Sequence, residues 1–116
     1  MIAAAGGIPK PIKVDPDHGF HLKAADLEKA ITPRSRVLLM NTPSNPTGAV
    51  FTRAEIEKIG KVCEKKDLWI ISDEVYATLT YGNTVFSSPF DVPELEKRPS
   101  SCRRSRSRMP CRACCG

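Results

Sequence analysis

Two stretches of sequence decide the fold: Val37-Leu-Leu-Met-Asn-Thr-Pro-Ser-Asn-Pro-Thr-Gly48 and Leu68-Trp-Ile-Ile-Ser-Asp-Glu-Val-Tyr76. Each begins with a short apolar run, over residues 37–40 and 68–72, and continues into polar residues. Short continuous apolar runs are typical of strands that are buried on both faces in a parallel sheet. We therefore expect two neighbouring parallel strands and an α/β fold.

A helix is expected between these strands. Thr52-Arg-Ala-Glu55 has the spacing of a capping box, in which the hydroxyl and the carboxylate satisfy backbone donors at a helix start. The apolar residues that follow recur at spacings of three and four: Ile56, Ile59, Val62 and Cys63. The helix should run to about Lys66. The unit is then strand, helix, strand, with a right-handed crossover and a helix layer on the sheet.

Shorter elements are expected on either side. The sequence predicts a strand over residues 12–14, a turn over 15–19, a short helix over 26–31, a strand or an extended loop over 78–81 and a short helix over 91–97. Pro33 ends the first of these helices. None of these elements carries a motif of its own.

Polar groups gather where the two buried strands end. Asn45 lies in the loop after the first strand, and Asp73 and Tyr76 follow the second. The carboxyl ends of parallel strands meet at one sheet edge, where α/β proteins bind cofactors. An amide, a carboxylate and a phenol suit a planar heteroaromatic ring with a basic nitrogen and a phenolic oxygen. Pyridoxal phosphate is such a ring.

The same two stretches resemble the class I/II aminotransferases, the fold-type I enzymes that depend on pyridoxal phosphate. The resemblance covers residues 5–98, a central slice of a family member. It implies a partial three-layer sandwich with a mostly parallel sheet, taken from the large domain of these enzymes. It also implies amino acid and 2-oxo acid substrates, and for the intact enzyme a homodimer whose sites are completed across the interface. The residues that select the amino donor would lie outside this slice.

The resemblance gives each polar residue a role. Asp73 would pair with the protonated pyridine nitrogen, so that the ring can accept electrons as the substrate Cα loses a proton. Tyr76 and Asn45 would donate to the 3-oxygen of the cofactor, and the Asn45–Pro46 bond would be cis. Taken alone, each residue has a simpler explanation. Asp73 could cap a helix, Tyr76 could be a rim aromatic, and Asn45 could be a turn residue.

One catalytic group of the family is missing. A transaminase needs a lysine that forms a Schiff base with the cofactor and then moves the proton. In the family this lysine follows the second motif after about one further strand, but no lysine follows Lys97 in this sequence. We therefore expect no catalytic residue in the chain and an inactive fragment of an aminotransferase. The family's phosphate-binding helix start and substrate-binding arginines are not found either.

The composition changes near Pro99. Residues 1–98 hold all 13 Asp and Glu and 13 of the 18 Lys and Arg, so the net charge of +5 comes from residues 99–116, which also hold four of the five Cys. We interpret 99–116 as a disordered Arg/Cys-rich tail left by a reading-frame slip, and 1–98 as the partial large domain. The alternative is a non-enzymatic, degenerate fragment whose basic tail binds nucleic acid or a partner protein.

Other features restrict the function further. No apolar run reaches about 18 residues and residues 1–7 are too short for a secretion signal, so we expect a cytoplasmic protein. His18 and His21 have no acid or cysteine pair in a metal-binding pattern, so we interpret them as surface histidines and expect no metal. Trp69 is expected to pack in the core.

Overall fold

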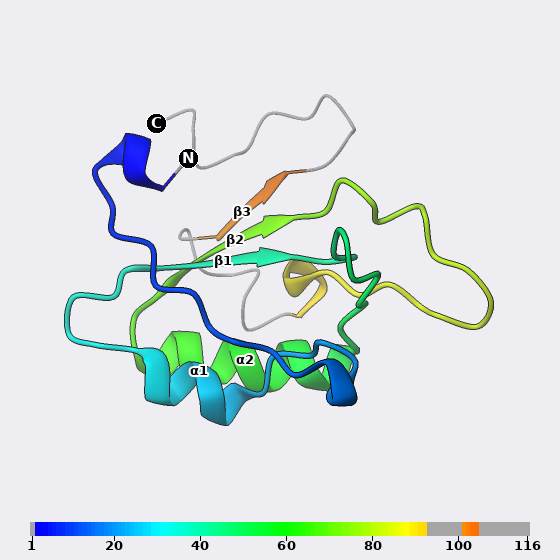
Figure 1. Ribbon diagram of the computed structural model, residues 1–116, viewed down its shortest axis with the longest axis horizontal. Coiled ribbons are helices and arrows are strands. Elements are labelled where there is room, and N and C mark those ends of the chain that lie inside the picture. The colour runs from blue at the N-terminus through cyan, green and yellow to red at the C-terminus, as the bar shows by residue number, and fades with distance from the viewer. Residues whose placement is uncertain (1, 93–100, 105–116) are drawn as a thin grey trace.

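The computed structural model describes residues 2–92 and the backbone of residues 101–104. They form an α/β unit with a parallel sheet and helices on one face of it (Figure 1). The strands lie in the order β1 (Val37–Asn41), β2 (Trp69–Asp73) and β3 (Ser101–Arg104). The helices are α1 (Ala24–Ala30) and α2 (Arg53–Lys65), with 3₁₀ turns η1 (Ala3–Ala5), η2 (Pro16–His18) and η3 (Pro89–Asp91).

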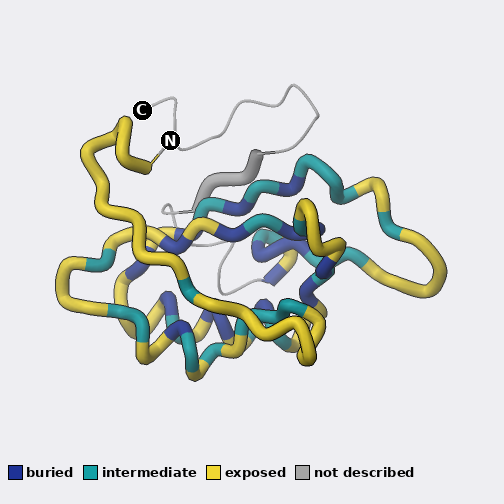
Figure 2. Tube along the Cα trace, viewed as in Figure 1, coloured by how far each residue is buried: buried dark blue, intermediate teal, exposed yellow. Residues whose placement is uncertain are grey.

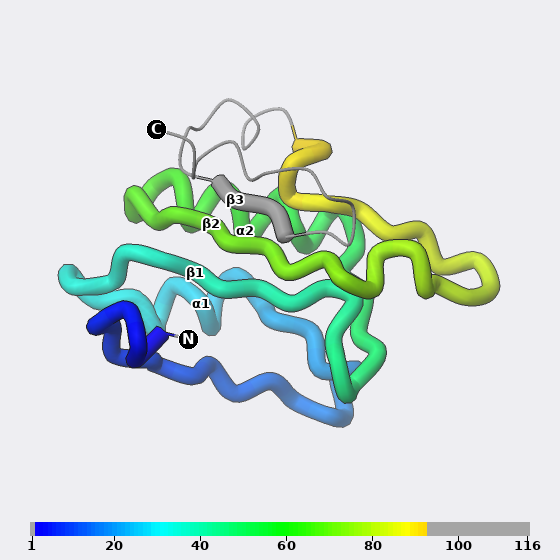
Figure 3. The backbone as a smooth tube through the Cα atoms, turned by 90° about the horizontal axis from the view of Figure 1, so that it is seen from above, coloured from blue at the N-terminus to red at the C-terminus, as the bar shows by residue number. Residues whose placement is uncertain are grey.

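The predicted strand, helix, strand unit is confirmed. β1 and β2 pair in parallel, with Val37 opposite Trp69 at one end and Asn41 opposite Asp73 at the other. α2 connects them and lies against the sheet, with α1 beside it, as the view from above shows (Figure 3). Helices on one face and neighbouring parallel strands are the arrangement of an α/β domain. The α/β fold class expected from the sequence is therefore observed.

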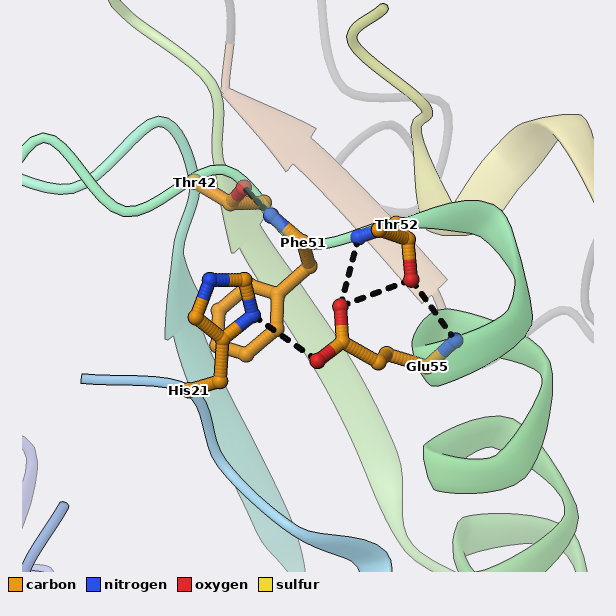
Figure 4. A network of polar contacts seen from close by, with 5 residues as sticks. All are labelled: His21, Thr42, Phe51, Thr52 and Glu55. Atoms are coloured by element: carbon orange, nitrogen blue, oxygen red, sulfur yellow. Dashed lines mark hydrogen bonds and ion pairs between the residues drawn. The ribbon is translucent and has the colours of Figure 1, made fainter. Parts of the chain in front are cut away.

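The capping box at the start of α2 is also confirmed. Glu55 Oε2 accepts hydrogen bonds from Thr52 N at 2.8 Å and Thr52 Oγ1 at 2.7 Å, and Glu55 N points back at Thr52 Oγ1 at 3.4 Å. The other oxygen, Glu55 Oε1, lies 2.8 Å from His21 Nδ1, and the His21 ring packs edge-on against Phe51 (Figure 4). These contacts connect the start of α2 to the segment that precedes α1.

These contacts make the stability of the chain depend on pH. Burial raises the pKa of Glu55, but the hydrogen bonds from Thr52 and the His21 ring outweigh it and hold the pKa below the ordinary 4.5. A lowered carboxyl pKa stabilises the fold above the unfolded value, and that stability is lost as the pH falls through the folded value.

We expect the free energy of unfolding to decrease as the pH falls below about 4.5, where Glu55 becomes protonated. Glu55→Gln keeps a capping side chain but cannot titrate, so denaturant unfolding at pH 7 and pH 3 should show a smaller pH dependence. Glu57→Gln is the matched control, because Glu57 is on the same helix and pairs only with Arg53 at 3.0 Å among the described ion pairs. Equal pH dependence in both variants would contradict this account.

The core lies between the sheet and the helices. Ile56 and Ile59 of α2 are nearly inaccessible, and they pack against the buried positions of both strands. The buried cluster consists of Leu27, Leu38, Met40, Phe51, Ile56, Ile59, Cys63, Leu68, Ile70 and Val92. The helix positions that the sequence spacing selected for the core are among them, with Val62 packed at the margin.

The expectation of strands buried on both faces is wrong for the described residues. Burial alternates along β1 and β2, as Figure 2 shows, and the exposed apolar residues of the outer face are Val37 (51% exposed), Leu39 (40%) and Trp69 (46%). Trp69 therefore does not lie in the core. The described helices α1 and α2 cover one side of the sheet, so alternate residues of β1 and β2 remain in contact with solvent.

The exposed sheet face should make the chain associate. Three large exposed apolar side chains on one face of the sheet favour self-association, and among the described residues no strand pairs with the outer edge of β1. Trp69→Thr keeps a strand-forming residue and removes the largest of them. Light scattering over a concentration series should show less association for Trp69→Thr than for wild type. Ile8→Thr, at an exposed position outside the sheet, is the control, and an equal effect there would contradict the proposal.

Several shorter elements differ from the sequence-based expectation. Residues 12–14 form no strand and pair with none of the described strands, although Ile12 packs against the core. Residues 78–81 form a loop. Of the helix expected over 91–97, Asp91 is the last residue of η3 and Val92 is its C-cap, and residues 93–97 lie outside the described residues. The first helix begins at Ala24 instead of residue 26.

The segment 99–116 is described only in part. Residues 101–104 form β3, which pairs in parallel with β2, whereas the Arg/Cys-rich composition predicted a disordered tail. Its other residues lie outside the described range. Within the part of the chain that is described, no helix is long and apolar enough to cross a membrane.

Candidate functional site

The three residues singled out in the sequence lie at the carboxyl edge of the sheet. Asp73 is the last residue of β2, Tyr76 follows it in the turn, and Asn45 lies in the loop over residues 42–51 that joins β1 to α2. The loop and the turn are adjacent because β1 and β2 pair in parallel. The topology thus brings together an amide and a phenol from two connections and a carboxylate from a strand end.

Asn45 and Tyr76 are in direct contact. Asn45 Nδ2 donates a hydrogen bond to the Tyr76 hydroxyl at 3.2 Å, across 31 positions of sequence. The Asn45–Pro46 bond is cis, as the resemblance implied, and Thr42–Pro43 is cis as well. An amide nitrogen has two hydrogens, so Asn45 can donate to Tyr76 and to a second acceptor at once. The pair can therefore present two donors to one oxygen of a ligand.

Asp73 differs from this pair because one of its oxygens is buried without a partner. Asp73 Oδ1 is inaccessible to solvent and has no hydrogen-bond partner among the described residues. A buried carboxylate oxygen without a donor is costly, whereas a cation or an N–H donor beside it would satisfy it. Ser72 Oγ is also buried without a partner there, but it is a neutral hydroxyl. The carboxylate is the group that most requires a ligand.

The neighbouring acid of the motif has a different place. Glu74 is buried, and its Oε1 accepts a hydrogen bond from Ser88 Oγ at 2.6 Å. Ser88 also begins η3, where it and Asp91 form a second capping box. Glu74 therefore anchors the segment that returns from the exposed loop, while Asp73 ends β2 at the carboxyl edge of the sheet.

The loop that carries Asn45 is closed by its own hydrogen bonds. Ser44 N donates to Ala49 O at 2.9 Å and Gly48 N donates to Ser44 O at 2.8 Å. At its base, Phe51 N donates to the buried Thr42 Oγ1 at 3.3 Å (Figure 4). Gly48 has φ of 72°, a left-handed conformation that glycine adopts without strain. The loop is thereby held as a compact turn above the strand ends.

An open groove of about 540 Å³ runs along this loop. Asn45 and Tyr76 form part of its wall, and the other lining residues are Pro43, Ser44, Pro46, Gly48, Val50, Leu79, Thr80, Tyr81 and Thr84. Asp73 is not part of the wall. The groove therefore gives access to the amide and the phenol, whereas Asp73, with its Oδ1 buried, lies at the end of β2 outside the groove wall.

The two histidines are engaged elsewhere. His18 Nδ1 lies 2.7 Å from Asp15 Oδ2, and this contact, with the N–H of Asp17, lowers the pKa of the Asp15 carboxyl. His21 contacts Glu55. Within the part of the chain that is described, no group of three or more His, Cys, Asp or Glu side chains could hold a metal ion.

A family profile matches nearly the whole chain. The profile of "Aminotransferase class I and II" covers residues 1–107. The chain belongs to this family. This aminotransferase sequence is 46% identical over 95 residues to an aspartate aminotransferase of Streptomyces avermitilis, covering 81% of the chain and 23% of the relative. It is 42% identical over 100 residues to a probable aspartate/prephenate aminotransferase of Rhizobium leguminosarum, covering 84% and 25%.

Solved aminotransferase structures contain the same fold. The aromatic aminotransferase of Pyrococcus horikoshii matches with a TM-score of 0.84 and 31% identity, over 90% of this chain and 27% of that one. A double mutant of the Thermus thermophilus aspartate aminotransferase matches with a TM-score of 0.77 and 32% identity, over 87% and 25%. The unit is thus a piece of the fold-type I architecture. The aminotransferase chain spans about a quarter of the length of the relatives that it matches.

Membership of this aminotransferase family implies pyridoxal phosphate as the cofactor, and the residues present fit part of it. The unpaired Asp73 Oδ1 suits a protonated ring nitrogen, and the Asn45 and Tyr76 pair suits an oxygen on the ring. The sequence did not identify Asn41, whose Oδ1 accepts a hydrogen bond from the Asn45 backbone N–H at 3.0 Å. The only indication in the sequence was the position of Asn41, directly after the predicted strand and four residues before Asn45.

Proposed function

We propose that Asn45, Asp73 and Tyr76 form the ring-binding part of a pyridoxal phosphate site in an aminotransferase that moves an amino group from an amino acid to a 2-oxo acid. The observation that carries the proposal is the buried, unpaired Asp73 Oδ1 at the carboxyl edge of the sheet that also bears the Asn45 and Tyr76 pair. The family membership supports the same chemistry.

Each residue has a defined task in this proposal. The Asp73 carboxylate holds a proton on the ring nitrogen, because an anion beside a basic nitrogen favours its charged form. Asn45 Nδ2 and the Tyr76 hydroxyl donate to the 3-oxygen and orient the ring. When bound, pyridoxal phosphate supplies an electron sink that stabilises negative charge at the substrate Cα.

The 116 residues do not supply the whole reaction. No lysine lies beyond Lys97 in them, so we propose that they provide cofactor contacts without the lysine that carries the cofactor and moves the proton. We also propose that the intact enzyme is a homodimer. The boundary at residue 98, the frame slip after it and the cytoplasmic location stay predictions, and the family match itself extends to residue 107.

A chimera tests the proposed function. The segment of the Streptomyces avermitilis aspartate aminotransferase that aligns with this chain would be replaced by the aligned residues of this chain, which are 46% identical. We expect the purified chimera to bind pyridoxal phosphate and to transfer the amino group of aspartate to 2-oxoglutarate. A folded chimera that binds no pyridoxal phosphate would contradict the proposal.

A further inference from the structure

Asn41 lies between the residues of the proposed site. It is the last residue of β1, half-buried, and directly opposite Asp73 in the register of the two strands. Its Oδ1 accepts a hydrogen bond from the backbone N–H of Asn45 at 3.0 Å. Its Nδ2 points at the carbonyl oxygen of Asp73, at 3.5 Å. One side chain thus touches the backbone of two of the three proposed cofactor contacts.

Among the described hydrogen bonds, no other one involves the backbone of Asn45. The bonds inside the loop join Ser44 to Ala49 and to Gly48, and the bond at its base joins Thr42 to Phe51. None of them involves Asn45. The contact with Asn41 is therefore the described hydrogen bond that joins the Asn45 backbone to the end of β1, and the Asn45 side-chain amide in turn contacts Tyr76.

The chemistry of asparagine suits this place. The carboxamide offers an acceptor to the Asn45 N–H and a donor to the Asp73 carbonyl, without adding charge beside the Asp73 carboxylate. Aspartate would keep the acceptor and lose the donor. Alanine would lose both. The 3.0 Å contact is the stronger of the two, because a distance of 3.5 Å is at the limit of a hydrogen bond.

We propose that Asn41 is a positioning residue of the site: by holding the Asn45 backbone, it sets the Asn45 amide against Tyr76 and in line with Asp73. The proposal deepens the proposed function and rests on it for the identity of the ligand. The positioning itself is a property of the free chain. It can therefore be tested without any cofactor.

The first test uses NMR of the complete 116-residue chain. In wild type, we expect the Asn45 backbone amide to be protected from hydrogen exchange and the Asn45 side-chain amide protons to show an NOE to the Tyr76 ring. In Asn41→Ala, Asn45 should exchange about fivefold faster, as for the loss of one hydrogen bond, and the NOE should disappear. The amides of β2 should exchange as in wild type. Asn83→Ala, at an exposed loop asparagine, is the matched control and should change neither signal.

If Asn41→Ala fails to fold, Asn41→Asp still tests whether Asn41 positions Asn45. It keeps the acceptor, so Asn45 protection and the NOE to Tyr76 should be retained. Loss of both signals in Asn41→Asp with β2 intact would overturn the proposal. So would retention of both in a folded Asn41→Ala variant.

A double-mutant cycle in the chimera tests the link to the cofactor. The readout is the pH at which bound pyridoxal phosphate changes colour. If Asn41 acts through Asn45, then Asn41→Ala and Asn45→Ala should move this pH in the same direction, and the double variant should move it no further than Asn45→Ala. Additive shifts would overturn the proposal. If Asn45→Ala itself moves nothing, the proposed role of Asn45 fails, and the NMR result then decides the positioning role alone.

Discussion

Asp73→Ala in the chimera should lower kcat for transamination about a thousandfold, the largest effect of any substitution in the site. Removing one partner of a buried charge pair costs about 3–5 kcal/mol, and each 1.36 kcal/mol is about tenfold in rate. The loss should appear in kcat, because the proton on the ring nitrogen matters most when charge develops at the substrate Cα. Steady-state kinetics with aspartate and 2-oxoglutarate measures it, after absorbance has shown that the cofactor is bound.

Tyr76→Phe and Asn45→Ala are the matched comparisons. Each removes one hydrogen bond to a charged oxygen, which is worth about 1.5–3 kcal/mol, so each should cost about tenfold to a hundredfold in rate. Asp73→Asn should resemble Asp73→Ala, because it keeps the shape and loses the charge. The assignment of Asp73 to the ring nitrogen would be wrong if Asp73→Ala cost less than about tenfold, or about 1.4 kcal/mol.

The second large effect concerns the 116 residues by themselves. They should show no transamination above the uncatalysed rate, because no lysine on a family motif is present to carry the cofactor and move the proton. Pyridoxal phosphate should give only adducts with surface lysines. The measurement is turnover of a panel of amino acids with 2-oxoglutarate, in protein purified from a host that lacks its own aminotransferases of this class.

The chimera is the positive control for that measurement. It adds the lysine segment and the substrate-binding residues of the relative to the same cofactor contacts, so activity should return with it. Measurable turnover by the 116 residues alone, abolished by Asp73→Ala, would contradict the account.

Local signals in the sequence predicted the elements that carry the site. The capping box at Thr52 and Glu55 depends on residues three apart, and the buried face of α2 depends on a repeat of three and four, so both can be found without the tertiary structure. β1 and β2 began within one residue of the expected positions, because short apolar runs bounded by polar residues mark their ends. Parallel pairing then placed Asn45 and Tyr76 at the same edge of the sheet, and the loop conformation brings them into contact.

The burial of a strand residue depends on which other elements pack over it, and this could not be predicted from local signals. Val37, Leu39 and Trp69 have the apolar character of core residues, yet they are exposed because the helices cover the other face. The run at residues 12–14 has strand-forming residues but pairs with none of the described strands. The role of Asn41 was missed for a different reason. Its contact with the Asn45 backbone is set by the loop conformation, which the residue types alone do not reveal.

The ionisation of the ring nitrogen tests the central claim most directly. Pyridoxal phosphate labelled with ¹⁵N in the ring would be bound to the chimera, and the ¹⁵N chemical shift would be followed with pH in wild type and in Asp73→Asn. The account predicts a protonated nitrogen near neutral pH in wild type and an unprotonated one in Asp73→Asn, because the Asp73 carboxylate supplies the negative charge that holds the proton. The same shift in both proteins would contradict it.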